Sequence, residues 1–224
     1  MIQSSPIIDL DGREEIVPFS RQADPIGTLV IENISHRYRI SDSQYVATLE
    51  NVSIRIAPRE FVSIVGQSGC GKSTLLNILV GLVSPESGTI TLRPNKTDLQ
   101  GLIGFVPQED RLFPWRTVLR NTEYPLEIKG DVSPRERREI ALDRLERVGL
   151  SHARDFHPHQ LSGGMRQRVS IARALTTDPE VLLLDEPFGA LDAKVRKELR
   201  RWLRQLHGEI HVTSSFVTHD QEEA

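Results

Sequence analysis

The sequence of 224 residues predicts an α/β fold. An apolar run of strand length, residues 61–65, leads through a glycine-rich loop into residues 74–82, whose apolar positions recur at helical spacing. A second apolar run, residues 181–184, lacks polar alternation, as expected for a strand buried on both faces of a parallel sheet. Between them, residues 108 to about 160 are richer in charge and have a helical pattern, which predicts a helical insertion in the α/β core.

Composition and charge exclude several classes of protein. Hydrophobic residues make up 38% of the chain and charged residues 26%, values typical of a globular domain. The formal net charge of −3 argues against bulk binding of nucleic acid, which usually requires a strongly basic domain. A single cysteine excludes an intramolecular disulfide, and no run of about 18 apolar residues offers a membrane span. Any role at a membrane is therefore expected to be peripheral.

The elements of the N-terminal half follow from local patterns. Residues 1–27 are expected to form an extended or poorly ordered leader, because prolines and acids interrupt their scattered apolar residues. Strands are expected at residues 29–32 and 49–56, the second with the alternation of a half-exposed strand. After the first helix, residues 89–92 and 103–106 predict two further short strands.

Prolines are expected to divide the helical insertion, at Pro114, Pro125 and Pro134. The clearest helix start is at Ser133, a capping residue followed by proline at the first helical position and by a glutamate that completes a capping box. The apolar spacing that follows predicts a helix ending at Gly149.

Two more elements close the core. Residues 191–206 predict a helix with one apolar and one basic face, and residues 215–218 predict a last strand. The basic face is interpreted as solvated, with lipid headgroups or RNA as alternative partners. Its cations are Lys194, Arg196, Lys197, Arg200, Arg201 and Arg204.

The expected domain covers residues 28–224. Its core would consist of residues 28–107 and 166–224, interrupted by the insertion at about 108–165. Residues 220–223 have the pattern of a capping-box helix start, yet the sequence stops one residue later. A truncated C-terminus is therefore expected.

The glycine-rich loop at residues 66–73 fits the pattern G-x-x-x-x-G-K-[ST] between a strand and a helix, which predicts a phosphate site. The glycines let backbone N–H groups surround phosphate oxygens, and the helix N-terminus adds partial positive charge. Lys72 is expected to contact the β- and γ-phosphates, and Ser73 to bind Mg²⁺. Cys70 is interpreted as a small residue tolerated in the loop, with a regulatory thiol as the alternative. The predicted nucleotide-binding residues here are Gly66, Gln67, Ser68, Gly69, Cys70, Gly71, Lys72, Ser73 and Thr74.

Two carboxylates and a second glycine pair are further candidate site residues. Asp185 and Glu186 directly follow the buried strand, at the sheet edge where α/β folds bind ligands. Asp185 is suited to hold Mg²⁺, and Glu186 is placed to polarise an attacking water as general base. Ser162, Gly163 and Gly164 precede another helix, which predicts a second anion-binding helix start.

These motifs together resemble the ATP-binding subunit of ABC transporters, over about residues 28–224. Residues 66–73 resemble its Walker A loop, residues 161–167 its signature motif, and residues 181–186 its Walker B strand. The resemblance implies a P-loop NTPase core, a mixed sheet flanked by helices, with an N-terminal antiparallel β subdomain and an inserted α-helical subdomain. It also implies ATP and Mg²⁺ as cofactors and ATP hydrolysis as the activity.

Further roles come from the resemblance alone. Tyr38 stands where the family stacks an aromatic ring on adenine, and Gln108 corresponds to the Q-loop residue that contacts nucleotide and Mg²⁺. Asp192 would cross a dimer interface, and Ser162–Gly164 would contact the γ-phosphate held by a second, head-to-tail chain. The expected catalytic residues are Glu186, the switch histidine His219, and Lys72.

The resemblance also implies partners. A single cassette without membrane spans favours the ATPase of an importer, acting as a homodimer with separate permease subunits and, indirectly, a periplasmic or lipid-anchored substrate-binding protein. It would lie peripherally on the cytoplasmic face of the bacterial inner membrane and bind no nucleic acid. Phe113 and Trp115 would face the permease, with core packing as the alternative.

Two segments disagree about the cargo. Residues 108–118 are similar to the importers of nitrate, sulfonate and taurine, which predicts a small anion of that group. Residues 216–224 look more like importers of sulfate, molybdate or polyamine, and these remain an alternative. A soluble ABC ATPase without a transport role is the other alternative.

Overall fold

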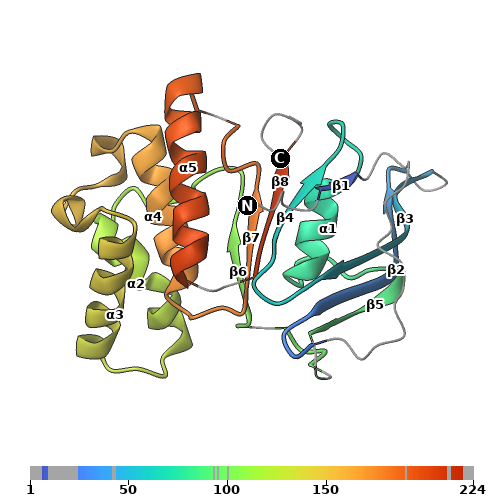
Figure 1. Ribbon diagram of the computed structural model, residues 1–224, viewed down its shortest axis with the longest axis horizontal. Coiled ribbons are helices and arrows are strands. Elements are labelled where there is room, and N and C mark those ends of the chain that lie inside the picture. Colours follow the sequence, from blue (N-terminus) through green and yellow to red (C-terminus); the bar gives the residue numbers. More distant parts are fainter. Residues whose placement is uncertain are drawn as a thin grey trace. The chain divides into compact units, whose positions relative to one another are not determined.

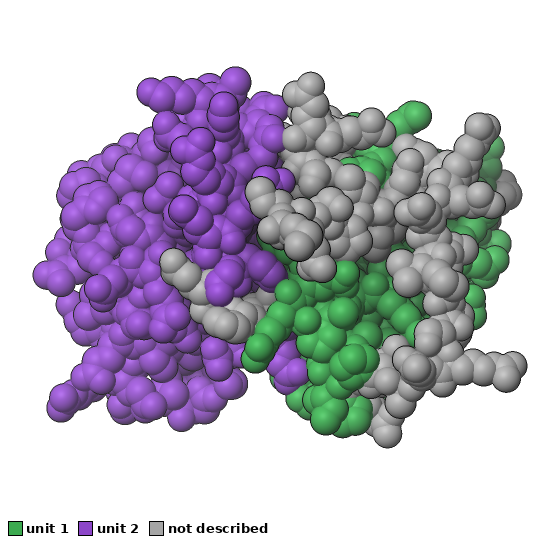
Figure 2. Space-filling view, viewed as in Figure 1, with its two compact units in different colours: residues 1–103, 212–224 green, residues 104–211 purple. Residues whose placement is uncertain are grey.

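The chain forms two compact units, residues 1–103 with 212–224 and residues 104–211, coloured separately in Figure 2. The computed structural model describes residues 7–9, 25–41, 44–92, 94, 96–99, 101–189, 191–210 and 213–218, without the side chains of 7–9, 209–210 and 216–218. Among the described helices, none is both long and apolar enough to cross a membrane.

The first unit contains a parallel sheet built around the strand that enters the glycine loop (Figure 1). β4 (Phe61–Val65) lies between β1 (Ile7–Asp9) and β8 (Thr213–Thr218), and both neighbours run parallel to it. Four of the five β4 residues are buried, as its apolar, β-branched composition predicts. A short extended strand thus lies within the expected leader, whose residues 1–6 and 10–24 fall outside the described part of the chain.

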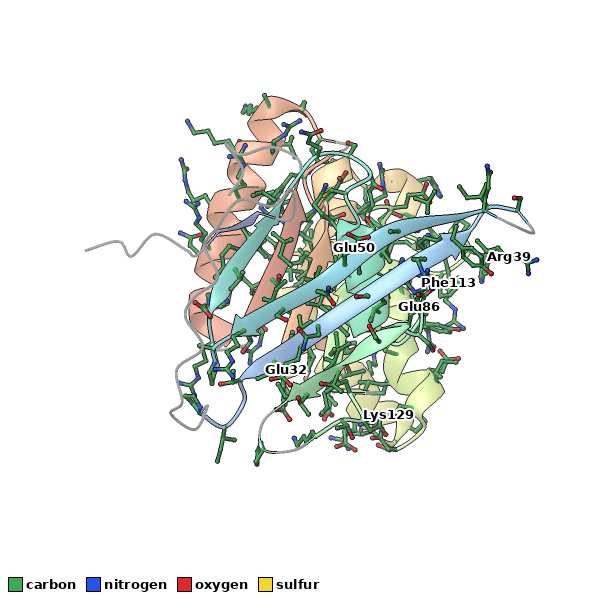
Figure 3. The ribbon with its side chains drawn as sticks, turned by 90° about the vertical axis from the view of Figure 1, so that its right-hand side faces the viewer. Glu32, Arg39, Glu50, Glu86, Phe113 and Lys129 are labelled. Carbon is green, nitrogen blue, oxygen red and sulfur yellow. The ribbon has the colours of Figure 1, made fainter. Side chains whose placement is uncertain are left out.

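An antiparallel sheet completes this unit, in the order β3-β2-β5, and Figure 3 shows its three strands side by side. They are β2 (Leu29–Arg39), β3 (Tyr45–Ile56) and β5 (Ser87–Leu92). β2 and β3 are longer than the sequence predicts, because irregular register lets the pairing continue past polar residues. Asn33 adopts a φ of 52° there and donates its backbone N–H to Ser53 Oγ at 2.9 Å.

The first helix, α1 (Lys72–Leu79), is shorter at its C-terminal end than the expected 74–82. Its C-cap is Val80, and the next residue, Gly81, has a φ of 77°. A left-handed glycine at this position is a common helix stop, and it ends α1 before the last apolar residue of the periodic pattern.

The second unit begins at Gly104, within β6 (Ile103–Val106), and β6 neighbours β7 (Val181–Asp185). Every residue of β7 is buried, as predicted for residues 181–184. Helices α2 (Val118–Lys129), α3 (Pro134–Arg147) and α4 (Gly163–Leu175) pack on one another, and α5 (Ala193–Ile210) follows. The predicted α/β fold with an antiparallel sheet and a helical region is confirmed. The unit boundary at 103/104 does not test the expected insertion limits of 108 and 165, because the second unit also contains β7 and α5.

One predicted helix break is wrong. Pro125 lies inside α2 and does not divide the helical region. A proline removes one backbone hydrogen bond from a helix, but α2 packs against both α3 and α4, and that burial maintains the helix across it. The capped start at Ser133 is confirmed, because its side chain accepts a hydrogen bond from Glu136 N. The helix it opens ends with Val148 as C-cap, and Gly149 follows with a φ of 72°.

Candidate functional site

The glycine loop of the first unit surrounds the ammonium group of Lys72. Lys72 Nζ donates hydrogen bonds of 2.7 Å to both Gly66 O and Gln67 O, and it lies 3.7 Å from Cys70 Sγ. The lysine is only 5% exposed. A buried ammonium with several donors and a curled backbone around it is the arrangement that a phosphate chain needs as its counter-charge.

Two glycines of this loop have left-handed backbone conformations. Gly71 is the N-cap of α1 with a φ of 100°, and a Cβ there would lie 2.4 Å from Thr48 O. Gly69 has a φ of 88°, but a Cβ there would meet nothing within 4 Å. Only glycine fits at position 71, whereas position 69 needs glycine for its conformation alone.

The N-terminus of α1 suits a phosphate group. In α2, α3 and α4 a Thr or Ser side chain caps the first turn, whereas among the described residues no side chain caps α1, and its first turn contains no acid. Its N–H groups and the partial positive charge of the helix start therefore face a position that an anion would satisfy. The loop thus fits the implied nucleotide. Ser73 is exposed at this start, whereas Thr74 is buried.

In the second unit, the predicted general base and the Q-loop residue are in direct contact. Gln108 Nε2 donates a 2.9 Å hydrogen bond to Glu186 Oε2. Glu186 has a φ of 45°, an uncommon conformation for a residue other than glycine that is often found at functional sites. Asp185 ends β7 and is 7% exposed.

The implied Mg²⁺ matches the donor types present. A carboxylate, an amide oxygen and a hydroxyl are hard oxygen ligands, and Mg²⁺ typically uses one or two protein ligands together with substrate phosphates. The predicted set is Ser73, Gln108 and Asp185. Within the described residues, no group of three or more His, Cys, Asp or Glu side chains forms a metal cluster. Gln108 contacts Glu186 through its amide nitrogen, whereas a cation would bind the amide oxygen.

The signature residues lie at the start of α4. Ser162 is the N-cap, and its Oγ accepts a 3.3 Å hydrogen bond from Met165 N. A Cβ at Gly164 would lie 2.8 Å from Val195 Cγ1, so this glycine allows α4 and α5 to approach closely. A cavity of about 270 Å³, lined in part by Ser162 and Gly164, opens on this side of the second unit.

The remaining predicted residues that the structure describes make other contacts. Tyr38 is 42% exposed on β2, and its ring makes an edge contact with His36 at 4.7 Å. Asp192 caps α5, because its Oδ1 accepts hydrogen bonds from Lys194 N and Val195 N. His219 lies outside the described residues. The glycine loop and Tyr38 belong to the first unit, whereas the Q-loop, carboxylate and signature residues belong to the second.

An aromatic segment of the second unit is exposed. Trp115 is 72% exposed, and Phe113 contacts both Trp115 and Tyr124, with ring centroids 5.4 and 4.6 Å apart. Arg116 stacks on Phe113 and Tyr124 and forms a 2.7 Å ion pair with Glu127. The hydrogen bond from Arg116 holds the pKa of Glu127 below its ordinary value of 4.5.

Sequence reasoning missed the residue that holds this segment. Asn121, fully buried in α2, accepts a 2.7 Å hydrogen bond from Phe113 N. Its Nδ2 donates to the carbonyls of Phe113, Arg116 and Thr117 at 3.0–3.1 Å. No local pattern distinguishes this asparagine from an exposed polar residue of the helix. Its role depends on tertiary burial.

The fold and site define a P-loop nucleotide-binding protein with a helical subdomain. The profile of the ABC transporter family matches residues 49–189, more than half of the chain, and the chain therefore belongs to this family. A dimeric post-hydrolysis structure of the ATP-binding cassette MJ0796, bound to ADP and Pi, is similar with a TM-score of 0.75 and 39% identity over 88% of this chain and 90% of that one. The structure of cbiO1 from Clostridium perfringens, part of the ABC transporter complex cbiONQ, has a TM-score of 0.75 and 29% identity, covering 88% and 80%.

Curated relatives are named for their cargo. The sulfate/thiosulfate import ATP-binding protein CysA of Vibrio vulnificus is 50% identical over 189 residues, which cover 79% of this chain and 53% of the relative. The protein of the same name from Bordetella bronchiseptica is 52% identical over 183 residues, covering 79% and 52%. The chain therefore spans about half the length of these relatives. The names agree with the sulfate alternative and give no support to the nitrate, sulfonate and taurine group.

Proposed function

We propose that this chain is the ATP-binding and ATP-hydrolysing part of an ABC importer for sulfate or thiosulfate. The observation that carries the proposal is the glycine loop, with Lys72 held between Gly66 O and Gln67 O beside an uncapped helix start. Family membership supports the cassette, and the names of relatives about 50% identical support the cargo. A growth experiment distinguishes sulfate and thiosulfate from nitrate, molybdate and polyamine as the transported cargo.

Each predicted residue has a role in this proposal. Lys72 and Ser73 hold the phosphates and Mg²⁺, with Asp185 and Gln108 as further metal ligands and Tyr38 against adenine. Bound Mg·ATP supplies the phosphoryl group and most of the charge neutralisation. Glu186 orients water and accepts its proton, a contribution of about 10²–10⁴-fold for a positioned base. The hydrogen bond from Gln108 orients the Glu186 carboxylate.

The active form would be a head-to-tail homodimer. Ser162–Gly164 of one chain would then complete the phosphate site on the glycine loop of the other, because Ser162 is exposed and the helix that it opens offers N–H groups to an anion. Asp192 would cross the interface, and His219 would contact the γ-phosphate from the chain that carries Lys72. The similar cassette MJ0796 was solved as a dimer, which supports this arrangement.

The membrane partners would be two permease subunits, with a periplasmic or lipid-anchored substrate-binding protein acting through them. Trp115 is a suitable anchor for a permease segment, since an exposed aromatic on a fixed loop loses little entropy when it is buried. The chain would lie on the cytoplasmic face of the bacterial inner membrane without spanning it.

Replacement of the proposed base tests the activity. We expect Glu186→Gln to bind ATP with wild-type affinity, to lose hydrolysis by at least about 10²-fold, and to accumulate as an ATP-bound dimer in light scattering. The control is Glu109→Gln, which removes an exposed carboxylate next to Gln108 and should leave turnover unchanged. Undiminished hydrolysis in Glu186→Gln would rule out this residue as the base.

Growth tests the cargo. A bacterium that lacks its own sulfate-import ATPase but keeps the matching permease should grow on sulfate as sole sulfur source when this cassette is expressed as the ATPase domain of the missing subunit. The Glu186→Gln variant should not restore growth. Failure with sulfate and thiosulfate, together with restored nitrate, molybdate or polyamine uptake in the corresponding deletion strain, would reassign the cargo while leaving the ATPase proposal intact.

A further inference from the structure

One face of α4 binds the segment that follows Gln108. Ser170 Oγ donates a 2.9 Å hydrogen bond to the backbone carbonyl of Asp110, and Arg173 Nη2 donates one of 2.8 Å to the same oxygen. Arg173 Nη1 also donates to Arg111 O at 2.8 Å. Burial lowers the pKa of the Arg173 guanidinium, and the charge of Asp110 opposes this shift. These contacts fix the backbone of the segment on the helix.

A contact of another kind joins the same segment to the start of α4. Arg166 Nε donates a 2.9 Å hydrogen bond to Asp110 Oδ2, and Arg166 Nη1 donates one of 2.8 Å to Leu161 O. One planar guanidinium thus holds the Asp110 side chain and the residue directly before Ser162. Because its N–H groups have fixed directions, it sets an orientation as well as a distance. The two side chains are 37% and 31% exposed, so water screens the pair less than at an open surface.

We propose that the Asp110–Arg166 ion pair is a latch that positions Ser162–Gly164 relative to Gln108. Asp110 comes two residues after Gln108, and Arg166 comes four residues after Ser162. A movement of Gln108 away from Glu186, toward nucleotide, would act through the latch on the first turn of α4. The inference rests on the proposed function, in which Gln108 and the signature residues both contact nucleotide. Asp110 and Arg166 are positioning residues in this scheme.

Two variants remove the latch in different ways. In Asp110→Ala the backbone carbonyl remains, so Ser170 and Arg173 still hold the segment on the helix, although the 3.2 Å hydrogen bond from Leu112 N to Asp110 Oδ1 is lost as well. Arg166→Lys is the second variant, because lysine keeps the charge but its ammonium cannot reproduce the two diverging N–H bonds. The matched control is Arg135→Ala, which breaks an exposed Arg–Glu pair of the same 2.9 Å length on α3.

Hydrogen exchange in the absence of nucleotide measures the latch directly. We expect Asp110→Ala and Arg166→Lys to speed amide exchange at Met165 and Arg166, whose N–H groups bond to Ser162 Oγ and Ser162 O, about fivefold, the usual size for a partly exposed charged pair. The Arg135→Ala control should exchange there like wild type. Wild-type exchange at Met165 and Arg166 in Asp110→Ala would overturn the latch. If that variant fails to fold, the same result in Arg166→Lys would overturn it.

A second measurement separates the latch from the proposed function. In the Glu186→Gln background, Asp110→Ala should need about fivefold more ATP for dimer formation in light scattering, while its ATP affinity as a monomer stays unchanged. Weakened ATP binding by the monomer would contradict a positioning role and overturn the latch. A wild-type chain that neither binds nor hydrolyses ATP, but shows the coupled exchange, would refute the proposed function and leave the latch standing.

Discussion

Gly71 shows how one residue of the loop is fixed by its surroundings. Its φ of 100° and the carbonyl of Thr48, 2.4 Å from where a Cβ would lie, exclude every side chain. Gly69 has a similar conformation, with a φ of 88°, but open space around it. The sequence pattern marks both glycines equally, whereas the structure separates a steric requirement from a conformational one.

Alanine at these two positions should therefore have different effects. We expect Gly71→Ala to lower the free energy of unfolding by about 3–5 kcal/mol, because backbone strain and a backbone clash combine. Gly69→Ala should lower it by only about 1–2 kcal/mol, the strain of a left-handed alanine. Urea unfolding of the two variants measures the difference. Equal losses would show that the approach to Thr48 O relaxes without cost.

The site residues differ in how far the sequence could predict them. The residue types of the loop and of Asp185–Glu186 follow from a motif and from its position after a buried strand. The 2.9 Å contact between Gln108 and Glu186 does not, since 78 residues separate them and only tertiary packing places them together. The sequence does not predict the hydrogen-bond partners of Arg166, for the same reason.

At the scale of the element, α2 illustrates what local patterns miss. Pro125 predicts a helix break, yet it lies inside the helix, and nothing in the local pattern marks Asn121 as the fully buried residue that it is. Both outcomes depend on packing against α3 and α4, which no local pattern contains. By contrast, β4, β7 and the capped start of α3 are specified by their own residues, and the sequence predicted them correctly.

Removal of the Asn121 side chain should free the aromatic segment. We expect Asn121→Ala to lower the free energy of unfolding by about 2–4 kcal/mol, because the N–H of Phe113 loses its acceptor and three carbonyls lose a donor, of which Phe113 O and Thr117 O keep a backbone N–H. Permease-stimulated ATPase activity should fall more than basal activity. The neighbouring variant Thr122→Val, which removes one buried hydroxyl bonded to Val118 O, is the control and should cost about 1 kcal/mol or less. Equal losses of stimulated and basal activity would contradict a role for this loop in docking.

The Arg116–Glu127 pair gives α2 a pH-dependent contribution. The hydrogen bond from Arg116 lowers the pKa of Glu127, so the pair stabilises the fold above the ordinary value of 4.5 and loses its effect as the pH falls through the lower folded value. We expect Arg116→Ala to be less stable than wild type by at most about 0.5 kcal/mol at pH 7, since the side chains of Arg116 and Glu127 are 26% and 37% exposed and water screens the pair. Urea unfolding should show the two proteins converging toward pH 3. A difference that persists there would mean that Arg116 acts through its stacking on Phe113 and Tyr124 instead.

At the scale of the whole molecule, the predicted site residues are divided between the two compact units. The glycine loop belongs to the first, and the predicted base and signature residues belong to the second. The sequence predicted the class of protein because both motifs are local. It left the cargo ambiguous, since residues 108–118 and 216–224 favour different importers and the ATPase cassette of an importer has no reason to contact the cargo.

A mixing experiment tests whether the chain works as a shared-site dimer. Lys72→Ala removes the glycine-loop half of the site, and Ser162→Arg blocks the signature half, so each variant alone should be inactive. A mixed dimer contains one site in which both halves are intact, because the loop of the Ser162→Arg chain faces the signature of the Lys72→Ala chain. Random pairing of equal amounts gives mixed dimers in half of the assemblies, each with one of two sites working. The mixture should therefore recover about a quarter of the wild-type hydrolysis per chain.

Ser162→Arg alone should still bind ATP as a monomer. Absence of recovery, when affinity tags on the two variants show that mixed dimers form, would mean that each chain completes its own site.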